Sequence, residues 1–348
     1  QKLEILLRSS VIAQATTKTM VTISVVAVLS LIIAITIAFI MGGSITAPIQ
    51  QLMKDVNIIA TGNFSHQPKV RTKDEVGALA KVLGEMAQSL KVGQDMFREN
   101  MERKHELSLA TEIQENLLPK KTPKIPGYDI SAFYSTSKEV GGDYYDFFLL
   151  DKFHLGAICA DVSGKGVPGS MVMMMAKALI TYEAMDNLSP KDIFVKVNKA
   201  IAKDIKRGMF VTAFYAVLDI QHKEMTVASA GHNPMLVYRA ATGQIEKVNP
   251  GGIALGFDKS GLLFEKNIQE QKVKLNSGDR VVIFTDGVTE AMSPEGEEFG
   301  DERFIGLTKQ CKGLSSDDYL QNLTAALRAH AQSDEQHDDI TIVTLLVK

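Results

Sequence analysis

The sequence has few of the residues that hold disulfide-rich proteins or zinc enzymes together. Its two cysteines, Cys159 and Cys311, lie far apart and within apolar surroundings. This argues against a disulfide scaffold and against zinc held by cysteines, and we expect two reduced thiols in the core of a cytosolic domain. The seven histidines include no closely spaced pair and no HExxH motif, which disfavours a zinc hydrolase.

The chain also lacks a strong excess of charge of either sign. Its formal net charge is −3 and charged residues make up 23% of it. Neither a basic nucleic-acid footprint nor an acidic tail is present, so we expect no nucleic-acid partner. The first residue is Gln rather than Met, and we expect a fragment or processed form in which residues 1–20 end an extracytoplasmic segment.

Charged residues are absent from residues 21–41, VTISVVAVLSLIIAITIAFIM. As a helix this run would be roughly 30 Å long, which matches the hydrocarbon core of a bilayer. A signal peptide has a shorter apolar region that ends at a small-residue cleavage site. We therefore predict a single span in the cell (inner) membrane. Positive charge lies mainly before the span, which gives no support for a cytoplasmic C-terminal side; we place that side in the cytoplasm because of the domain it carries.

Residues 42–94 contain two short amphipathic helical segments joined by an extended connector. Pro48 stands near the start of the first, and Asp74-Glu75 begin the second. Neither segment can bury its apolar stripe alone, so both need a partner chain. The pattern resembles a HAMP domain, the parallel helical relay below bacterial receptor membrane helices, and implies a homodimer through this module and the linker helix 95–122. The two stripes consist of Ile49, Leu52, Val56 and Ile59, and of Leu79, Leu83, Met86 and Leu90.

The linker contains His105-Glu106-Leu107, a possible phosphoacceptor of a histidine kinase. That hypothesis requires a downstream ATP-binding module with Asn-rich and Gly-x-Gly boxes, and we find neither. A solvated histidine on a linker helix is the simpler interpretation.

From residue 123 to 348 the sequence changes to short β-type runs, separated by glycine turns, around two helical stretches at 168–185 and 189–205. Strands cluster before and after this helical pair and do not alternate with helices. This pattern predicts an α+β domain with largely antiparallel sheets covered by helices. The expected strands are 128–134, 155–164, 210–219, 224–231, 234–239, 246–250, 279–287 and 339–347.

Carboxylates recur where these strands meet turns. A buried carboxylate is costly unless it is compensated, and several that converge would repel one another unless divalent cations neutralise them. Hard oxygen ligands beside glycines suit Mg²⁺ or Mn²⁺. Each position alone has a simpler explanation, since Asp286-Gly287 could be a hairpin turn. The candidates are Asp143, Asp161, Asp286, Asp338 and Asp339.

Eight ordered motifs across residues 107–348 resemble the SpoIIE-like (RsbU-like) branch of the metal-dependent PPM protein phosphatases, relatives of the type 2C enzymes. The resemblance implies a four-layer αββα sandwich that binds two Mn²⁺ or Mg²⁺ ions. The motifs are EIQENLLP, VGGDYYDFF, ADVSGKGVPGSMVM, FVTAFYAVLD, SAGHNPMLVYR, GIALG, VVIFTDGVTEA and DDITIVTL.

Matched motif by motif, the resemblance also implies roles for individual residues. Asp161 would bridge both ions, helped by the backbone carbonyl of Val162. Asp286 and Asp338 would bind one ion, and Asp339, where other branches carry Asn, ranks second to Asp338. Asp143 matches the first acidic position of the family. Asp161 and Asp286 would thus serve catalysis through water activated by the ions.

The implied activity is hydrolysis of phosphoserine or phosphothreonine on a partner protein, suspected to be a STAS-type anti-sigma-factor antagonist, under control of a membrane sensor through the HAMP relay. Gly141-Gly142-Asp143 also resembles the loop of a diguanylate cyclase, but Tyr144 stands where that enzyme needs an acid. A catalytically inactive scaffold of the same fold, and less readily a HAMP-linked histidine kinase, remain the alternatives.

Overall fold

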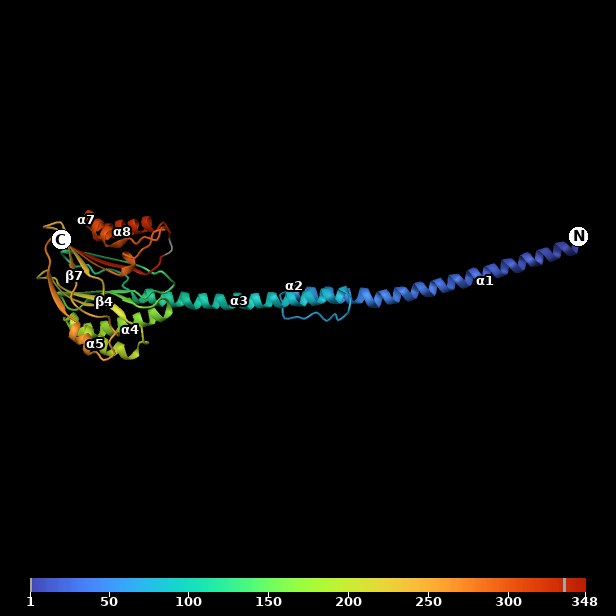
Figure 1. The fold of residues 1–348 in the computed structure, drawn as a ribbon, viewed down its shortest axis with the longest axis horizontal. Helices are drawn as coiled ribbons and strands as arrows, with labels where there is room; N and C mark the ends of the chain where they lie inside the picture. The colour runs from blue at the N-terminus through green and yellow to red at the C-terminus, as the bar shows by residue number, and fades with distance from the viewer. Residues whose placement is uncertain (1, 334–335) are drawn as a thin grey trace. The chain divides into compact units, whose positions relative to one another are not determined.

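The computed structural model describes residues 2–333 and 336–348, which form two compact units that meet in sequence between Arg103 and Lys104 (Figure 1). The first unit contains helix α1 (Lys2–Met41), a π-helical turn η1 (Gly42–Thr46) and helix α2 (Ala47–Ala60). Helix α3 (Glu75–Leu117) begins in the first unit and ends in the second.

One helical stretch in the described part of the chain, Ser10–Ala60, is long and apolar enough to cross a membrane. Its most apolar window has a mean hydropathy of 3.0, and none of that window is buried against other residues. Exposed apolar helices of this length are expected in a bilayer and not in water.

Helices α2 and α3 start where the sequence predicts. Pro48 lies in the first turn of α2, and the Asp74 carboxylate accepts from the backbone N–H of Val76 at 3.1 Å beside the start of α3. The predicted stripes are only partly covered within one chain, since Leu52 is buried whereas Leu79 is 53% exposed. The uncovered half of each stripe is what a second chain would bury in a parallel helical dimer.

Asp55 fixes the connector between α2 and α3. Its fully buried carboxylate contacts His66 Nε2 at 2.7 Å, and accepts from the backbone N–H of Lys69 at 3.0 Å and from Gln51 Nε2 at 3.1 Å. Burial alone would raise the pKa of Asp55, but these bonds lower it below its usual value. The sequence analysis did not identify this role.

The second unit contains two five-stranded antiparallel sheets. One has the order β1-β10-β9-β6-β7 and the other β2-β3-β4-β5-β8. The bounds are β1 Tyr128–Ser135, β2 Tyr144–Leu149, β3 His154–Val162, β4 Val211–Asp219, β5 Glu224–Ala230, β6 Met235–Arg239, β7 Gln244–Val248, β8 Glu270–Lys274, β9 Arg280–Phe284 and β10 Ile340–Val347.

Helices cover the outer face of each sheet (Figure 1). Helices α4 (Val167–Ala184) and α5 (Pro190–Asp204) pack on the sheet that contains β3, and α7 (Gly300–Gln310) and α8 (Ser316–Ala331) pack on the other. The short helix α6 (Leu262–Asn267) and the 3₁₀ turn η2 (Asp286–Val288) complete the unit. The predicted αββα sandwich is confirmed, but the sequence analysis missed strands β2 and β8 and helices α7 and α8.

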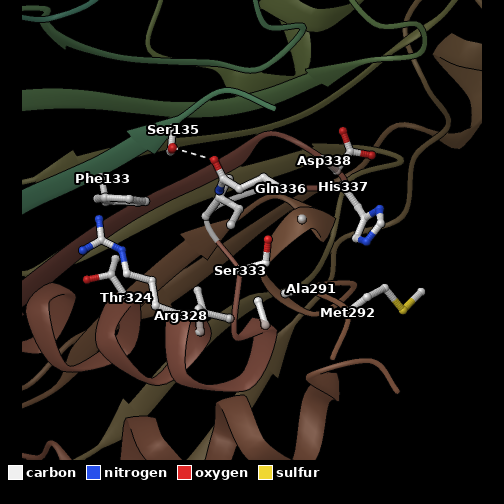
Figure 2. Close-up of a pocket in the computed structure, with 14 residues that line it drawn as sticks. Phe133, Ser135, Ala291, Met292, Thr324, Arg328, Ser333, Gln336, His337 and Asp338 are labelled. Atoms are coloured by element: carbon white, nitrogen blue, oxygen red, sulfur yellow. Dashed lines mark hydrogen bonds between the residues drawn. The ribbon is translucent and has the colours of Figure 1, made fainter. Parts of the chain in front are cut away.

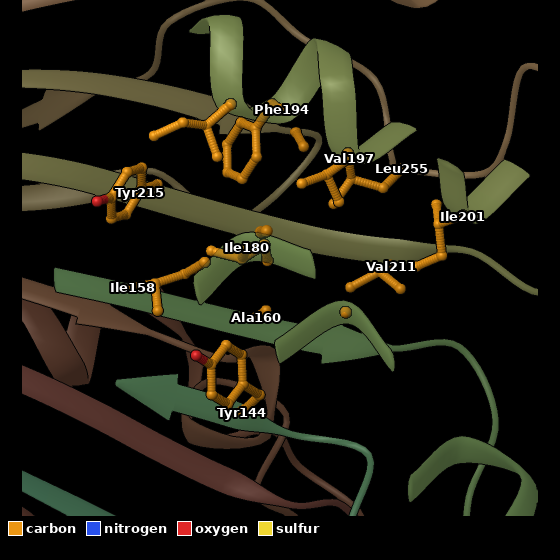
Figure 3. Close-up of a cluster of buried hydrophobic side chains, with 14 of the residues drawn as sticks. Tyr144, Ile158, Ala160, Ile180, Phe194, Val197, Ile201, Val211, Tyr215 and Leu255 are labelled. Atoms are coloured by element: carbon orange, nitrogen blue, oxygen red, sulfur yellow. The ribbon is translucent and has the colours of Figure 1, made fainter. Parts of the chain in front are cut away.

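Three apolar clusters fill the spaces between the four layers: one between each pair of helices and its sheet, and one between the two sheets. Each strand contributes to two of them, because successive residues of a strand face opposite sides of a sheet. On β3, Ile158 and Ala160 pack under α4 and α5 (Figure 3), whereas Cys159 packs between the sheets. On β9, Val282 and Phe284 face α7 and α8. Cys159 and Cys311 are buried and unpaired, as predicted.

Phe194 tests the packing of α5 on its sheet. Its side chain is fully buried, with its ring centroid 6.3 Å from that of Tyr215. We expect Phe194→Ala to lower the free energy of unfolding of the second unit by about 3–5 kcal/mol, measured by amide hydrogen exchange on the detergent-solubilised chain. Leu262→Ala, at a side chain that is 74% exposed, should change it by less than about 0.5 kcal/mol. Similar effects of both substitutions would contradict this account.

Candidate metal-binding active site

The sheet that contains β3 brings two of the predicted carboxylates together. Tyr144, the first residue of β2, pairs with Ala160 of the antiparallel strand β3. Asp143 and Asp161 therefore lie opposite each other at the ends of these two strands. The two carboxyl groups are close enough that the charge of Asp161 acts on Asp143. Val162 ends β3, and its carbonyl lies beside Gly142.

The other sheet supplies the remaining carboxylates from the ends of two neighbouring strands. Phe284 ends β9 opposite Ile342 of β10, so Asp286 lies two residues after one strand end, and Asp338 and Asp339 are the two residues before the start of the other strand. The charges of Asp286, Asp338 and Asp339 all act on Asp161 across the two sheets. Carboxylates from four separate parts of the chain therefore gather at one end of the sandwich.

Asp143 is the most deeply buried member of this group, with 1% of its surface exposed. Its Oδ2 accepts hydrogen bonds from Thr285 Oγ1 at 2.7 Å and Thr341 Oγ1 at 2.5 Å. Burial and, second, the charge of Asp161 raise the pKa of Asp143 well above its usual value, although the two hydroxyl groups oppose that rise.

Asp161 lies at the centre of the charge repulsion. Burial first, and then the charges of Asp286, Asp338 and Asp339, raise its pKa to about 7. Burial and the charge of Asp338 raise the pKa of Asp286 as well. Carboxyl groups that resist ionisation together in this way are typical of sites that a cation must complete.

The two aspartates before β10, Asp338 and Asp339, make different contacts. The Asp339 side chain is 6% exposed, and it accepts hydrogen bonds from the backbone N–H groups of Ser137 and Gly142, each at 2.7 Å. It thereby fixes the two loops beside the site. Asp338 is less buried and forms an ion pair with Lys165, Nζ to Oδ2 at 2.9 Å. Both carboxylate oxygens of Asp339 accept backbone hydrogen bonds, and the ranking of Asp338 ahead of Asp339 as a ligand stays a prediction.

The donor chemistry of the cluster fits hard divalent ions. It contains carboxylate and backbone carbonyl oxygens and no His or Cys, which is the set that Mg²⁺ and Mn²⁺ prefer. Asp143 and Asp161 are buried against other acids, and their raised pKa values show that this charge is poorly compensated. Within residues 2–333 and 336–348, no three acidic, His or Cys side chains are already arranged as ligands of one ion. The hydrogen bonds on Asp143 and the ion pair of Asp338 occupy oxygens that an ion would use.

A cavity of about 140 Å³ adjoins the cluster (Figure 2). Gly287 and Asp338 line it next to the carboxylates, and Arg328 lines it from α8. Ser135 Oγ donates to Gln336 Oε1 at 2.7 Å along its wall. Asp338 lies at one side of this cavity, and the Arg328 side chain lies near Phe133 at the other side (Figure 2).

Several residues of the site were missed in the sequence analysis. Thr285 and Thr341 carry the hydroxyl groups that bind Asp143, and their positions next to Asp286 and two residues after Asp339 were the available signal. Lys165 lies within the motif ADVSGKGVPGSMVM, four residues after Asp161, and its ion pair with Asp338 was not predicted.

Comparison with known proteins agrees with this geometry. Residues 151–348, more than half of the chain, match the family described as Stage II sporulation protein E (SpoIIE), and residues 40–92 match the HAMP domain. Phosphoserine phosphatase RsbU of Bacillus subtilis is 29% identical over 245 residues, which cover 70% of each protein. Protein IcfG of Synechocystis is 26% identical over 332 residues, 86% of this chain and 51% of that protein.

The fold has a counterpart among solved structures. The SiaA-PP2C domain of Pseudomonas aeruginosa superposes with a TM-score of 0.63 at 20% sequence identity, covering 72% of this chain and 99% of that domain. The two sheets with their covering helices have the PP2C-like fold, and the similarity to RsbU indicates a serine/threonine phosphatase. The chain belongs to the SpoIIE family.

The raised pKa of Asp161 leads to a prediction about pH and metal. In the metal-free chain, folding stability should fall as the pH rises from about 4 to about 7, because the folded carboxyl group keeps a proton that the unfolded one releases. Bound ions replace that proton, so Mn²⁺ should raise the thermal unfolding midpoint more at pH 8 than at pH 6. Asp161→Asn should reduce this difference. An equal Mn²⁺ effect at both pH values would contradict the assignment.

Proposed function

We propose that this chain is a membrane-anchored phosphatase that removes phosphate from phosphoserine or phosphothreonine on a partner protein. The observation that carries the proposal is the group of carboxylates from both sheets at one end of the sandwich, around Asp161. The family assignment supports the same reaction class.

Four side chains and one carbonyl would hold the ions. Asp161 and the carbonyl of Val162 lie at the end of β3, and Asp143 lies beside them with its orientation fixed by two threonine hydroxyl groups. Asp286 and Asp338 approach from the other sheet. When bound, two Mn²⁺ or Mg²⁺ ions supply Lewis acidity that lowers the pKa of water and offsets charge on phosphoryl oxygens.

The other residues of the site favour a dianionic substrate and keep the carboxylates oriented. Lys165 stands at the edge of the cluster, 2.9 Å from Asp338, where its ammonium group attracts a phosphate monoester. Arg328 adds a second cation to the wall of the cavity that Asp338 also lines. The described residues of the cluster include no Ser or Cys nucleophile, since Cys159 is buried between the sheets. Direct attack by water on phosphorus is the mechanism that this residue set supports.

The proposed substrate is a phosphorylated STAS-type domain, an anti-sigma-factor antagonist. The support is the resemblance to the RsbU-like branch. In the same proposal, the apolar helix α1 anchors a homodimer in the cell membrane, with the catalytic unit in the cytoplasm. The HAMP-like helices and α3 then carry a signal from a sensor to the phosphatase.

Two isosteric substitutions test the reaction. Asp161→Asn and Asp286→Asn should each reduce Mn²⁺-dependent release of phosphate from a phosphorylated STAS domain, and from p-nitrophenyl phosphate, on the order of a hundredfold or more. Asp301→Asn, at an exposed residue paired with Lys247, is the matched control and should stay near wild type. Near-normal activity in either site variant would refute the assignment. A wild-type chain that binds the STAS domain without hydrolysing either compound would indicate a scaffold instead.

Insertions in α3 test the relay. One residue inserted after Met96 rotates the two parts of the helix by about 100° relative to each other, whereas seven residues restore the phase to within about 20°. We expect the single insertion to change basal phosphatase activity several-fold and the seven-residue insertion to leave it near wild type. Equal activity in both would show that α3 is a passive tether.

A further inference from the structure

The cavity beside Asp338 has apolar walls that the core of the second unit holds in place. Leu327 and Ile340 are buried members of the apolar cluster under α7 and α8, and Phe133 and Ala291 pack against that cluster. These four side chains come from α8, β10, β1 and the segment after η2, so the packing of a whole layer sets the shape of the cavity. The walls are therefore in place before any ligand binds.

The volume of the cavity limits what it can hold. At about 140 Å³ it is smaller than the roughly 300–1,000 Å³ of the pockets that take cofactors and other small molecules. A single amino-acid side chain is a better match in size. The apolar walls suit a side chain with an aliphatic stem, because contact with CH₂ groups removes apolar surface from water on both partners.

The side of the cavity that lies away from Asp338 carries an unpaired cation. Arg328 is exposed to solvent, and its side chain lies near Phe133 (Figure 2). Among the residues that the structure describes, none forms an ion pair or a hydrogen bond with its guanidinium group. Asp338, by contrast, already pairs with Lys165 at 2.9 Å. The cavity thus offers a planar fork of N–H donors that matches the geometry of a carboxylate.

The position of the cavity connects it to the residues around a substrate phosphoserine. Asp338 belongs to the carboxylate cluster, and Gly287 follows Asp286 of that cluster; both also line the cavity. Successive residues of an extended peptide are about 3.3–3.6 Å apart. A phosphoserine bound at the cluster would therefore bring neighbours within about three positions to the mouth of the cavity.

We propose that this cavity is a specificity subsite that takes a glutamate side chain of the phosphorylated partner protein, within about three residues of the phosphoserine. The aliphatic part of the glutamate packs between Phe133, Leu327 and Ile340, and its carboxylate accepts hydrogen bonds from Arg328. Because Arg328 and Asp338 lie on different sides of the cavity, the phosphate and the carboxylate of the substrate bind at separate places. This inference rests on the proposed phosphatase function and adds a rule for which phosphoserine the chain prefers.

The test compares phosphopeptides on the full chain in detergent with Mn²⁺. Each peptide has one phosphoserine in an alanine-rich background and a single glutamate at one of the neighbouring positions, and its partner peptide has glutamine there. Arg328→Gln is the test variant, and Arg303→Gln, an arginine of α7 that pairs with Glu297, is the matched control. The readout is the ratio of kcat/KM for the glutamate and glutamine peptides, in which any effect of a variant on the chemical step cancels.

We expect the wild-type chain to prefer glutamate over glutamine about tenfold at one or two positions, through KM and not through kcat. Arg328→Gln should bring the ratio close to one, whereas Arg303→Gln should keep it. Aspartate at the best position should be a poorer substrate residue than glutamate, because its shorter stem does not span the apolar walls. Added salt should reduce the preference, since it screens the charge pair.

A second variant separates binding in the cavity from a general attraction to a surface charge. Ala291→Leu adds apolar atoms to the wall of the cavity and leaves Arg328 in place. It should lower the ratio for glutamate over glutamine towards one. An unchanged ratio in Ala291→Leu would show that Arg328 acts from the surface and that the cavity takes no side chain.

Three further results would overturn the inference. The first is a wild-type chain without a glutamate preference at any position, and the second is a preference that Arg328→Gln leaves unchanged. The third is a preference for leucine over glutamate in both the wild type and Arg328→Gln, which would mean that the cavity takes an apolar side chain.

Peptide binding without turnover distinguishes failure of this inference from failure of the proposed function. Fluorescence anisotropy of labelled peptides in EDTA gives Kd for the same peptide pairs while no ion-dependent hydrolysis takes place. An Arg328-dependent glutamate preference in binding, without turnover of any phosphopeptide or of p-nitrophenyl phosphate in Mn²⁺, would support the subsite and contradict the proposed reaction. Turnover without that preference would support the reaction and overturn the subsite.

Discussion

The mutual repulsion of buried carboxylates at one end of the sandwich is the constraint on which the rest of the second unit depends. Asp161 is buried and faces the charges of three other aspartates, and burial first and these charges second raise its pKa. A fold can keep such a group only if its backbone is rigidly specified. The two sheets and their three apolar clusters provide that rigidity, and Thr285, Thr341 and Ser137 bind the carboxylates that would otherwise turn away.

Much of this arrangement could be predicted from sequence, because each candidate aspartate follows or precedes a β-type run. Eight strands and two helices were placed from local patterns alone. Strand β8 was missed because Val273 is its one buried residue, so the period of two is weak. Helices α7 and α8, of 11 and 16 residues, were missed because they lie between the motifs VVIFTDGVTEA and DDITIVTL, outside the segments that the motifs and β-type runs define. The resemblance ranked Asp338 ahead of Asp339, but the loop contacts of Asp339 and the ion pair of Asp338 could not be predicted, because they depend on loops that are distant in sequence.

The same limit applies to the end of α3. The motif EIQENLLP was recognised as part of a family pattern, but nothing in its letters indicates what the glutamine binds. The Gln114 amide donates to the carbonyl of Gly141, which lies 27 residues further along the chain. Local patterns report burial and periodicity, whereas a hydrogen bond between a helix end and a loop is fixed only when the tertiary structure forms. Polar contacts of this kind are therefore found from coordinates.

The location of Cys159 has a consequence for how cells could control this protein. The thiol is fully buried between the sheets, and burial raises its pKa well above the usual value, so the reactive thiolate scarcely forms. Phosphatases that use a cysteine nucleophile lose activity when peroxide oxidises it. A catalyst built from carboxylates has no such vulnerable atom. Hydrolysis by this chain should persist through oxidative stress that silences thiol-based signalling.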